Sequence, residues 1–269
     1  MTRLIVSGCF GRMGEVVCRL AAENPRMSEV VAGIDLEFTD DSSCSSRTGF
    51  PMHLSNFSSY ESIRFCNDSA DAIICFLPPN AEAELLDTLE KSAEKGLPLV
   101  FCTTGQSAKV NDAIAKAAKK AAVLRSGNMS LGINLLSGVL AKIAPLLHES
   151  GFDIEITEKH HNQKIDAPSG TAFLLADSIN NSLGKKMRYV HDRSGAHEKR
   201  SRDEIGLHAL RGGTIVGEHT VTFAGHNEVI ELKHIAQSRE VFAVGAIKAA
   251  QFLVGKPPGL YTMQDVTDD

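Results

Sequence analysis

Residues 3–24 read "RLIVSGCFGRMGEVVCRLAAEN", and this stretch decides the fold of the first half of the chain. Its opening run, residues 3–7, is typical of a short buried strand, and the residues after Gly14 carry apolar side chains at helical spacing. Between the two, Gly8, Gly11 and Gly14 form a G-x-x-G-x-x-G pattern. Such glycines let the backbone turn tightly and approach a pyrophosphate, which the N–H groups of a helix start bind. The stretch therefore predicts the first unit of a dinucleotide-binding fold.

An acidic residue follows the glycines at the expected distance. The apolar run at residues 29–35 ends in Asp35, about 20 residues after the loop, where a carboxylate can bind the adenosine ribose hydroxyls. Glycine patterns also occur in βα turns that bind nothing, and this alternative stays open. Arg12 stacks on adenine or meets a phosphate if a dinucleotide binds, and is otherwise a solvated arginine.

The rest of the first half alternates between strand and helix patterns. Buried strands are predicted within residues 71–79, 97–105 and 122–127, and helices lie between them over 80–96 and 106–121. Residues 40–49 are serine-rich and predict a polar loop. Strands that alternate with helices of this length form parallel sheets, so we expect a Rossmann-like, doubly wound α/β domain.

The second half has a different pattern. A long apolar helix is expected over residues 131–150, and a half-buried strand over 152–161, where apolar and polar residues alternate. Residues 214–223 and 228–236 predict two strands of a hairpin. We expect a second α+β domain with a mixed, largely antiparallel sheet, followed by a last helix within residues 239–259.

Composition narrows the class of protein. The chain has 43% hydrophobic and 23% charged residues, and its net charge of -5 gives no support for nucleic-acid binding. All six cysteines lie in the first 102 residues without a C-x-x-C pair, which fits a reducing compartment. We find no apolar window long enough for a membrane span, and we interpret the acidic end as a solvated tail. A soluble, cytoplasmic protein is expected.

The densest polar stretch is "EKHHNQKIDAPSGTA", residues 158–172. A metal site is one interpretation, but adjacent histidines on a strand point to opposite faces, so no metal is predicted. A second is a solvated strand end and helix cap. The third is a catalytic site, which uses more of the residues.

In the catalytic interpretation, Pro168 leads into a helix whose first turn holds Ser169, Gly170 and Thr171. The N–H groups of that turn suit a carboxylate. Lys164 adds a cation and a proton donor, the histidines titrate near neutral pH, and Asp166 either caps the helix or orients Lys164. Hydride from the first domain, with an anion receptor and proton donors from the second, indicates a reductase of a carboxylated substrate.

These motifs resemble those of one known family. "EKHHNQKIDAPSGTA" is similar to the signature of bacterial dihydrodipicolinate reductases, which act in lysine and diaminopimelate biosynthesis. "GCFGRMG" resembles the family's cofactor loop, "CTTG" its G-T-T-G loop and "SGNMSLGIN" its interdomain segment. "GGTIVGEHTVTFAG" and "GLYTMQDV" resemble its C-terminal blocks. The resemblance covers the chain from end to end.

The resemblance implies roles for individual residues. The chain would reduce 4-hydroxy-tetrahydrodipicolinate, a small cyclic dicarboxylate, with NADH or NADPH. His160 and Lys164 would carry protons, and the carboxylates would be held by His161, Ser169, Gly170 and Thr171. The cofactor would be bound by Gly8, Cys9, Phe10, Gly11, Arg12, Met13, Asp35, Phe76, Cys102, Thr103, Thr104, Ser126, Gly127, Asn128 and Met129.

The resemblance also implies an organisation of the chain. Residues 1–127 and 238–269 would form the dinucleotide-binding domain, because the last helix returns to it. Residues 128–237 would bind the substrate and assemble the chain into a homotetramer.

Three departures from the family pattern concern the cofactor site. Cys102 replaces the first glycine of a G-T-T-G loop, and "CFLPP", residues 75–79, replaces the usual D-F-T-x-P. Leu36 follows Asp35 where many members have an arginine that meets the NADPH phosphate, and Glu15 occupies another frequent arginine position. A carboxylate favours a ribose diol and repels a phosphate, so we predict a preference for NADH, with NADPH still accepted.

Two other functions stay open. One is another two-domain dehydrogenase, such as one resembling aspartate-semialdehyde dehydrogenase, which would need a nucleophilic cysteine. The second half of this chain has none. The other is an inert dinucleotide sensor, which would need neither His160 nor Lys164.

Overall fold

A computed structural model of the chain describes residues 1–36, 53–56, 70–184, 187–195 and 197–269. These residues divide into two compact units, residues 1–130 with 240–269 (unit 1) and residues 131–239 (unit 2). The boundaries expected from the sequence, 127/128 and 237/238, differ from these by two or three residues. The serine-rich loop expected at residues 40–49 lies outside the described residues.

Unit 1 is built on a parallel sheet whose seven described strands run in the order β12-β6-β5-β4-β1-β2-β3. The chain moves outward from β1 in one direction and from β4 in the other, which is the order of a doubly wound sheet. The predicted Rossmann-like fold is confirmed. The strands are β1 (Thr2–Ser7), β2 (Ser28–Asp35), β3 (His53–Asn56), β4 (Ala72–Cys75), β5 (Leu99–Phe101), β6 (Ala122–Arg125) and β12 (Gly259–Tyr261).

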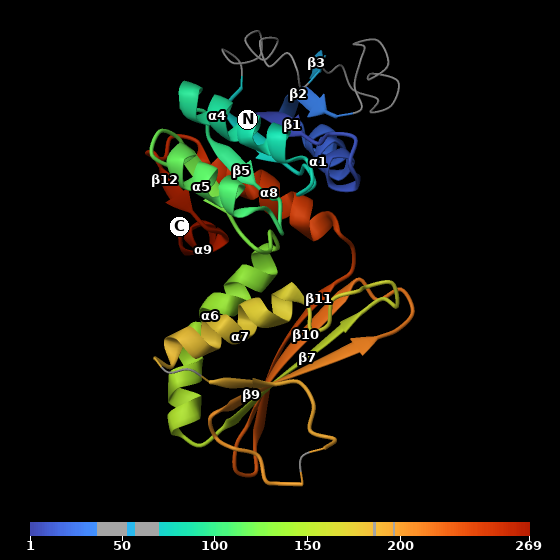
Figure 1. Ribbon diagram of the computed structural model, residues 1–269, viewed down its shortest axis with the longest axis vertical. Coiled ribbons are helices and arrows are strands. Elements are labelled where there is room, and N and C mark those ends of the chain that lie inside the picture. Colours follow the sequence, from blue (N-terminus) through green and yellow to red (C-terminus); the bar gives the residue numbers. More distant parts are fainter. Residues whose placement is uncertain (37–52, 57–69, 185–186, 196) are drawn as a thin grey trace. The chain divides into compact units, whose positions relative to one another are not determined.

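Helices cover both faces of this sheet (Figure 1). On one face α1 (Arg12–Glu23) packs with α8 (Glu240–Leu253), and on the other α4 (Glu82–Lys95) packs with α5 (Ala108–Ala117). Phe101 is fully buried in a core that also holds Leu89 of α4 and Ile114 of α5. Burial on both faces explains why these strands are continuous apolar runs rather than alternating ones.

The acidic C-terminal end, which we expected to be a solvated tail, exposes Asp265, Asp268 and Asp269, but it is ordered as part of a short helix. Residues 259–261 form β12, which pairs with β6, and Met263–Asp268 form the short helix α9. Met263 is fully buried, and the Asp265 carboxylate accepts hydrogen bonds from the backbone N–H and the hydroxyl of Thr262. Strand pairing and one anchoring side chain hold this segment, and neither is visible in composition.

Unit 2 contains a five-stranded sheet in the order β11-β10-β7-β9-β8. β10 is antiparallel to β7 and to β11, whereas β9 is parallel to β7 and to β8, so the sheet is mixed as predicted and only half of its pairings are antiparallel. The predicted hairpin is present, closed by a bond from Gly225 N to Glu228 O. The strands are β7 (Asp153–His160), β8 (Arg188–Val190), β9 (Glu204–Arg211), β10 (Gly217–Ala224) and β11 (Val229–Ala236).

Two helices, α6 (Leu131–Glu149) and α7 (Gly170–Ser182), cover one face of this second sheet. The alternating residues of β7 that we expected to be buried, such as Ile154 and Ile156, pack against Leu175 and Ile179 of α7. Glu158 and His160 lie on this same face of β7, towards the end of the strand.

Helix α6 corrects one expectation from the sequence. We found no window suitable for a membrane span, but α6 has 19 residues and a mean hydropathy of 1.4, so it satisfies the length and composition of such a span. A core helix passes the same test, and Leu140 and Ala144 of α6 are fully buried in the core of unit 2.

Candidate active site

The residues predicted to bind a dinucleotide lie at one edge of the sheet in unit 1. Each group follows the carboxyl end of a parallel strand: residues 8–13 after β1, Asp35 at the end of β2, Phe76 after β4, residues 102–104 after β5 and residues 126–129 after β6. β1 and β4 are neighbours, and the chain winds away from them in opposite directions. Ligands of doubly wound sheets bind at this position.

The glycine loop has the close approaches that its sequence predicts. Gly8 has a φ of +82°, and a Cβ atom there would lie 3.1 Å from the backbone carbonyl carbon of Phe76. A Cβ atom on Gly14 would lie 2.0 Å from the Gly8 carbonyl oxygen, so only glycine lets α1 start this close to the loop. Gly11, the N-cap residue of α1, offers no side chain to its first-turn N–H groups. The loop and helix start fit a pyrophosphate.

Asp35 has a contact that the sequence did not predict. Its carboxylate accepts a hydrogen bond of 2.9 Å from the backbone N–H of Phe10, and Gly8 N donates to Ile34 O at 2.7 Å. Asp35 therefore holds the glycine loop against the end of β2. Leu36, which follows it, has 44% of its surface exposed.

The two cysteines that depart from the family pattern are structurally tolerated. Cys102 is not among the residues with positive φ, so the replaced glycine leaves no backbone strain. Cys102 N donates to Cys75 O at 2.9 Å, and the Thr103 hydroxyl donates to Leu77 O at 2.7 Å, which ties the loops after β4 and β5 together. Burial raises the pKa of Cys75 to about 11 and raises the pKa of Cys102 well above its ordinary value.

The segment after β6 is shaped by its own side chains. The Ser126 hydroxyl donates to Asn128 O at 2.8 Å, and the Asn128 side-chain oxygen accepts from Ser130 N at the same distance. Met129 is buried, and so is Cys9 of the glycine loop. These last two side chains therefore face the protein interior, and what they can offer a cofactor is backbone.

In unit 2, the site is organised around a buried carboxylate that we had not singled out. Glu158 is fully buried and accepts four hydrogen bonds. His160 Nδ1 lies 2.6 Å from Oε2, the Arg211 guanidinium reaches both oxygens at 2.7 and 2.8 Å, and Ser169 N donates to Oε1 at 3.0 Å. One side chain thus connects the end of β7, the end of β9 and the start of α7.

The charges of this cluster depend on one another. Burial by itself raises the pKa of Glu158, but the hydrogen bonds from Arg211 and His160 outweigh it and hold the pKa below its usual value. Burial also lowers the pKa of His160, an effect that the Glu158 carboxylate only partly offsets. Glu158 is therefore an anion at neutral pH, and burial favours the neutral form of the His160 imidazole beside it.

Lys164 lies in the loop between β7 and α7. Its Nζ is 2.8 Å from Asp166 Oδ1, and Arg211 donates to the Asp166 backbone carbonyl at 2.6 Å. The side chain of Lys164 retains 22% of its exposure. Of the two roles considered for Asp166, the structure shows the one that orients Lys164, because the cap of α7 is the Ser169 hydroxyl, which accepts from Ala172 N.

Ser169 itself is enclosed by protein. Its hydroxyl lies 2.9 Å from His219 Nε2 of β10, and its backbone N–H is bound to Glu158. Burial lowers the pKa of His219 to about 4, so this histidine is neutral. The His160 and His219 rings meet edge to face with centroids 5.2 Å apart.

The other predicted substrate contacts are also located. His161 lies beyond the end of β7, and its carbonyl accepts from Lys164 N at 3.2 Å. Gly170 and Thr171 are the first residues of α7, directly after Ser169. Glu158 thus connects His160 with the start of α7, and Arg211 connects it with the loop that carries Lys164. Neither Arg211 nor His219 was among the residues predicted from the sequence.

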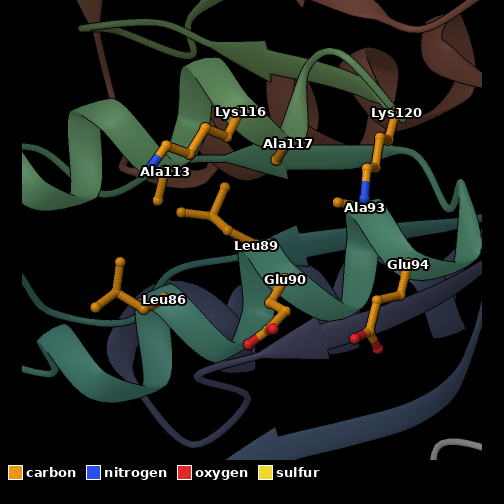
Figure 2. A pocket seen from close by; sticks show the side chains of 9 residues that line it. All are labelled: Leu86, Leu89, Glu90, Ala93, Glu94, Ala113, Lys116, Ala117 and Lys120. Atoms are coloured by element: carbon orange, nitrogen blue, oxygen red, sulfur yellow. The ribbon is translucent and has the colours of Figure 1, made fainter.

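Unit 1 also has a groove between α4 and α5, about 350 Å³ in volume (Figure 2). Its apolar part is formed by Leu86, Leu89, Ala93, Ala113 and Ala117. It is flanked by glutamates of α4 and by Lys116 of α5 and Lys120, which follows α5. It contains no residue predicted for cofactor or substrate.

The two units together define a class of protein. A doubly wound sheet with a glycine loop, and a second unit in which a histidine and a lysine lie beside a helix start, are the parts of a two-domain oxidoreductase that uses a nicotinamide dinucleotide. Comparison with known proteins then identifies the family. The N-terminal model of dihydrodipicolinate reductase matches residues 2–129 and the C-terminal model matches residues 132–267, so the chain belongs to the dihydrodipicolinate reductase family.

Individual relatives agree with this assignment. The chain is 48% identical to the 4-hydroxy-tetrahydrodipicolinate reductase of Caldanaerobacter subterraneus subsp. tengcongensis and 46% identical to that of Clostridium novyi, over 99% of this chain and 98% of each relative. In fold, it is similar to a dipicolinate-bound dihydrodipicolinate reductase from Paenisporosarcina sp. TG-14, with a TM-score of 0.72 over 97% of both chains at 22% identity. A probable dehydrogenase from Thermotoga maritima shares the fold at a TM-score of 0.62 and 11% identity.

Proposed function

We propose that this protein is a cytoplasmic 4-hydroxy-tetrahydrodipicolinate reductase of lysine and diaminopimelate biosynthesis, dependent on NADH or NADPH. The observation that carries this proposal is the cluster around Glu158, which gathers His160, the Lys164 loop and the start of α7. Relatives that are 46–48% identical over nearly their whole length bear this name.

The start of α7 would hold the substrate carboxylates. Gly170 and Thr171 are the first helical residues, where N–H groups and partial positive charge favour an anion. His161 is the third proposed contact. Ser169, whose hydroxyl and N–H are both bonded inside the protein, would shape this receptor rather than touch the substrate.

His160 and Lys164 would handle protons. The 4-hydroxy substrate loses water to give a conjugated imine. When bound, the reduced nicotinamide would supply the hydride that adds to this imine, and a proton would then be needed on the ring-nitrogen side. Lys164 holds protons on Nζ, 2.8 Å from Asp166, and His160 keeps Nε2 for the substrate because Nδ1 is bonded to Glu158. General acid catalysis of this kind contributes about 10²–10⁴-fold in rate.

The test is oxidation of NADH in the presence of the product of dihydrodipicolinate synthase. We expect turnover by the wild type and a fall in kcat of at least about 100-fold in Lys164→Ala, with cofactor affinity unchanged. Lys159→Ala is the matched control, because Lys159 lies in the same stretch but pairs with Glu218 on the opposite face of the sheet. Folded wild-type protein without turnover would refute the proposal.

Chemistry through a thiol is the competing function, and the structure disfavours it. The chain has no cysteine after Cys102, and burial raises the pKa of both Cys75 and Cys102, which makes them poor nucleophiles. A dehydrogenase of this kind would lose activity on alkylation, whereas we expect turnover to survive. A dinucleotide sensor would bind NADH and leave the substrate unchanged.

We also propose that NADH is preferred over NADPH. Asp35 places a carboxylate beside the glycine loop, Leu36 follows where an arginine would neutralise a 2′-phosphate, and Glu15 lies in the first turn of α1. Arg12, which is exposed, is the compensating cation near the loop. The comparison of kcat/KM for the two cofactors decides the matter, and a clearly higher value with NADPH would contradict it.

A homotetramer assembled through unit 2 is the third part of the proposal. On the sheet of unit 2, Leu210, Val229 and Ile235 retain 47%, 61% and 51% of their exposure, which is high for apolar side chains. The strand register puts Ile235 beside Glu218, on the face away from α6 and α7. Light scattering should give four times the chain mass, and Ile235→Asp should reduce it. Val254→Asp, in unit 1, is the control that should leave the mass unchanged.

A further inference from the structure

We propose that Glu158 is a positioning residue for the reaction. It fixes the His160 ring in the tautomer that carries its proton on Nδ1, and thereby presents Nε2 to the substrate. This inference rests on the proposed function for its link to turnover, but its structural content concerns only the protein. Glu158 touches neither substrate nor cofactor in this scheme and acts through His160.

The tautomer follows from the donors and acceptors around Glu158. An ionised carboxylate can only accept hydrogen bonds, so the 2.6 Å contact between its Oε2 and His160 Nδ1 requires a proton on that nitrogen. A neutral imidazole has one N–H, which leaves Nε2 with a lone pair. Gly217 of the neighbouring strand lies close to Nε2: a Cβ atom there would be only 3.1 Å from it, so any larger residue would crowd this nitrogen.

Arg211 makes this arrangement stable. A buried carboxylate without a cation would take up a proton, and a protonated acid could donate to Nδ1 and reverse the tautomer. The bidentate contact of the Arg211 guanidinium, at 2.7 and 2.8 Å, keeps Glu158 ionised. Arg211 also binds the carbonyl of Asp166, so the same cation fixes the loop that carries Lys164.

The same carboxylate connects proton transfer with substrate binding. Glu158 Oε1 accepts from Ser169 N, the residue that caps α7, while Oε2 accepts from His160. The start of α7 and the imidazole are therefore held by two oxygens of one rigid group. A shift of either would move the other, which suits a site that must place a carboxylate and a proton donor on one small molecule.

The other charged or titratable groups around His160 either lower its pKa, against the effect of Glu158, or carry no charge. Lys164 in the following loop and Arg211 on β9 lower the pKa of His160, as burial does most strongly, and Glu158 on β7 raises it. His219 on β10 meets the ring edge to face and is itself neutral, because burial lowers its pKa to about 4. Removal of the Glu158 charge should therefore lower the pKa of His160.

The experiment compares wild type with Glu158→Gln. Glutamine keeps an oxygen for Ser169 N but brings an amide that donates to Nδ1, so the proton should move to Nε2. Protein labelled with ¹⁵N in histidine shows the tautomer and the pKa of His160 by NMR, with the signal assigned from His160→Gln. Glu218→Gln is the matched control, since Glu218 lies on β10 but binds Lys159 and Lys233 on the other face of the sheet.

We expect an Nδ1–H signal for neutral His160 in wild type and in Glu218→Gln, and a mixed or Nε2–H signal in Glu158→Gln. In Glu158→Gln, kcat should fall at least about 100-fold, KM much less, and the limb of the pH profile due to His160 should move to lower pH. Glu158→Asp, which keeps the charge, should recover part of the loss.

An Nε2–H tautomer in wild type overturns the inference even if the variant does not fold. An unchanged tautomer and pKa in folded Glu158→Gln also overturn it. A third outcome is that the NMR signals are as expected but the wild type shows no turnover. This outcome would refute the proposed function and leave the role of Glu158 in fixing the His160 tautomer supported.

Discussion

Replacement of Arg211 by methionine should destabilise unit 2 strongly at neutral pH. The substitution leaves the fully buried Glu158 without its bidentate cation. Loss of one partner of a buried pair costs about 3–5 kcal/mol, because the remaining charge is uncompensated. We expect about 3 kcal/mol, the lower end of this range, since 20% of the Arg211 side chain is exposed.

The loss should depend on pH with a definite sign. In wild type the pKa of Glu158 is held below its unfolded value of about 4.3, so the carboxylate contributes stability above that pH, which is lost as pH falls through the folded pKa. Without Arg211, burial dominates and the folded pKa rises above the unfolded one. The variant then regains stability as pH falls and Glu158 becomes protonated. The difference between the two proteins should therefore shrink from pH 7.5 to pH 4.5.

Urea unfolding followed by far-UV circular dichroism measures this difference, because the chain has no tryptophan and only three tyrosines. Arg3→Met is the control: Arg3 pairs with Asp71 in unit 1, and both side chains are partly exposed, so its loss should be much smaller. The double variant Glu158→Gln with Arg211→Met should be more stable than Arg211→Met alone at pH 7.5. A double variant no more stable than the single one, or a loss independent of pH, would refute the reasoning.

Three further substitutions test other parts of the structure. Gly14→Ala should lower NADH affinity by at least about tenfold, because a Cβ atom 2.0 Å from the Gly8 oxygen displaces the start of α1. Gly195→Ala is the control, because a Cβ atom there meets nothing within 4 Å. Equal NADH affinities of the two variants in a titration would contradict this prediction. Asp166→Asn should lower kcat without a change in NADH affinity, because it removes the ion pair that orients Lys164 Nζ. An unchanged kcat would show that this ion pair has no role in turnover. Asp265→Ala should lower the free energy of unfolding of unit 1 by about 1 kcal/mol, because two hydrogen bonds with Thr262 are lost. Urea unfolding measures this change, and an unchanged midpoint would argue against α9 as a stabilising element.

The first unit follows largely from sequence because its signals are local. Apolar runs, helical spacing and the glycine pattern each act over a few residues, and they predicted the doubly wound sheet and the edge where its strands end. The short strand β12 and helix α9 were missed, since three strand residues show no periodicity and their stability comes from β6 and one buried methionine.

The candidate site was likewise predicted from the sequence only in part. The stretch from residue 158 to residue 172 contains His160, Lys164 and the start of α7, and sequence alone indicated that they work together. Arg211 and His219 are distant in the chain: Arg211 lies 53 residues from Glu158, and His219 lies 50 residues from Ser169. Pairing of β7 with β9 and β10 places Arg211 beside His160, and His219 beside Glu158. Register between strands depends on the packing of the whole sheet, so only the tertiary structure could show which cation keeps the buried carboxylate charged.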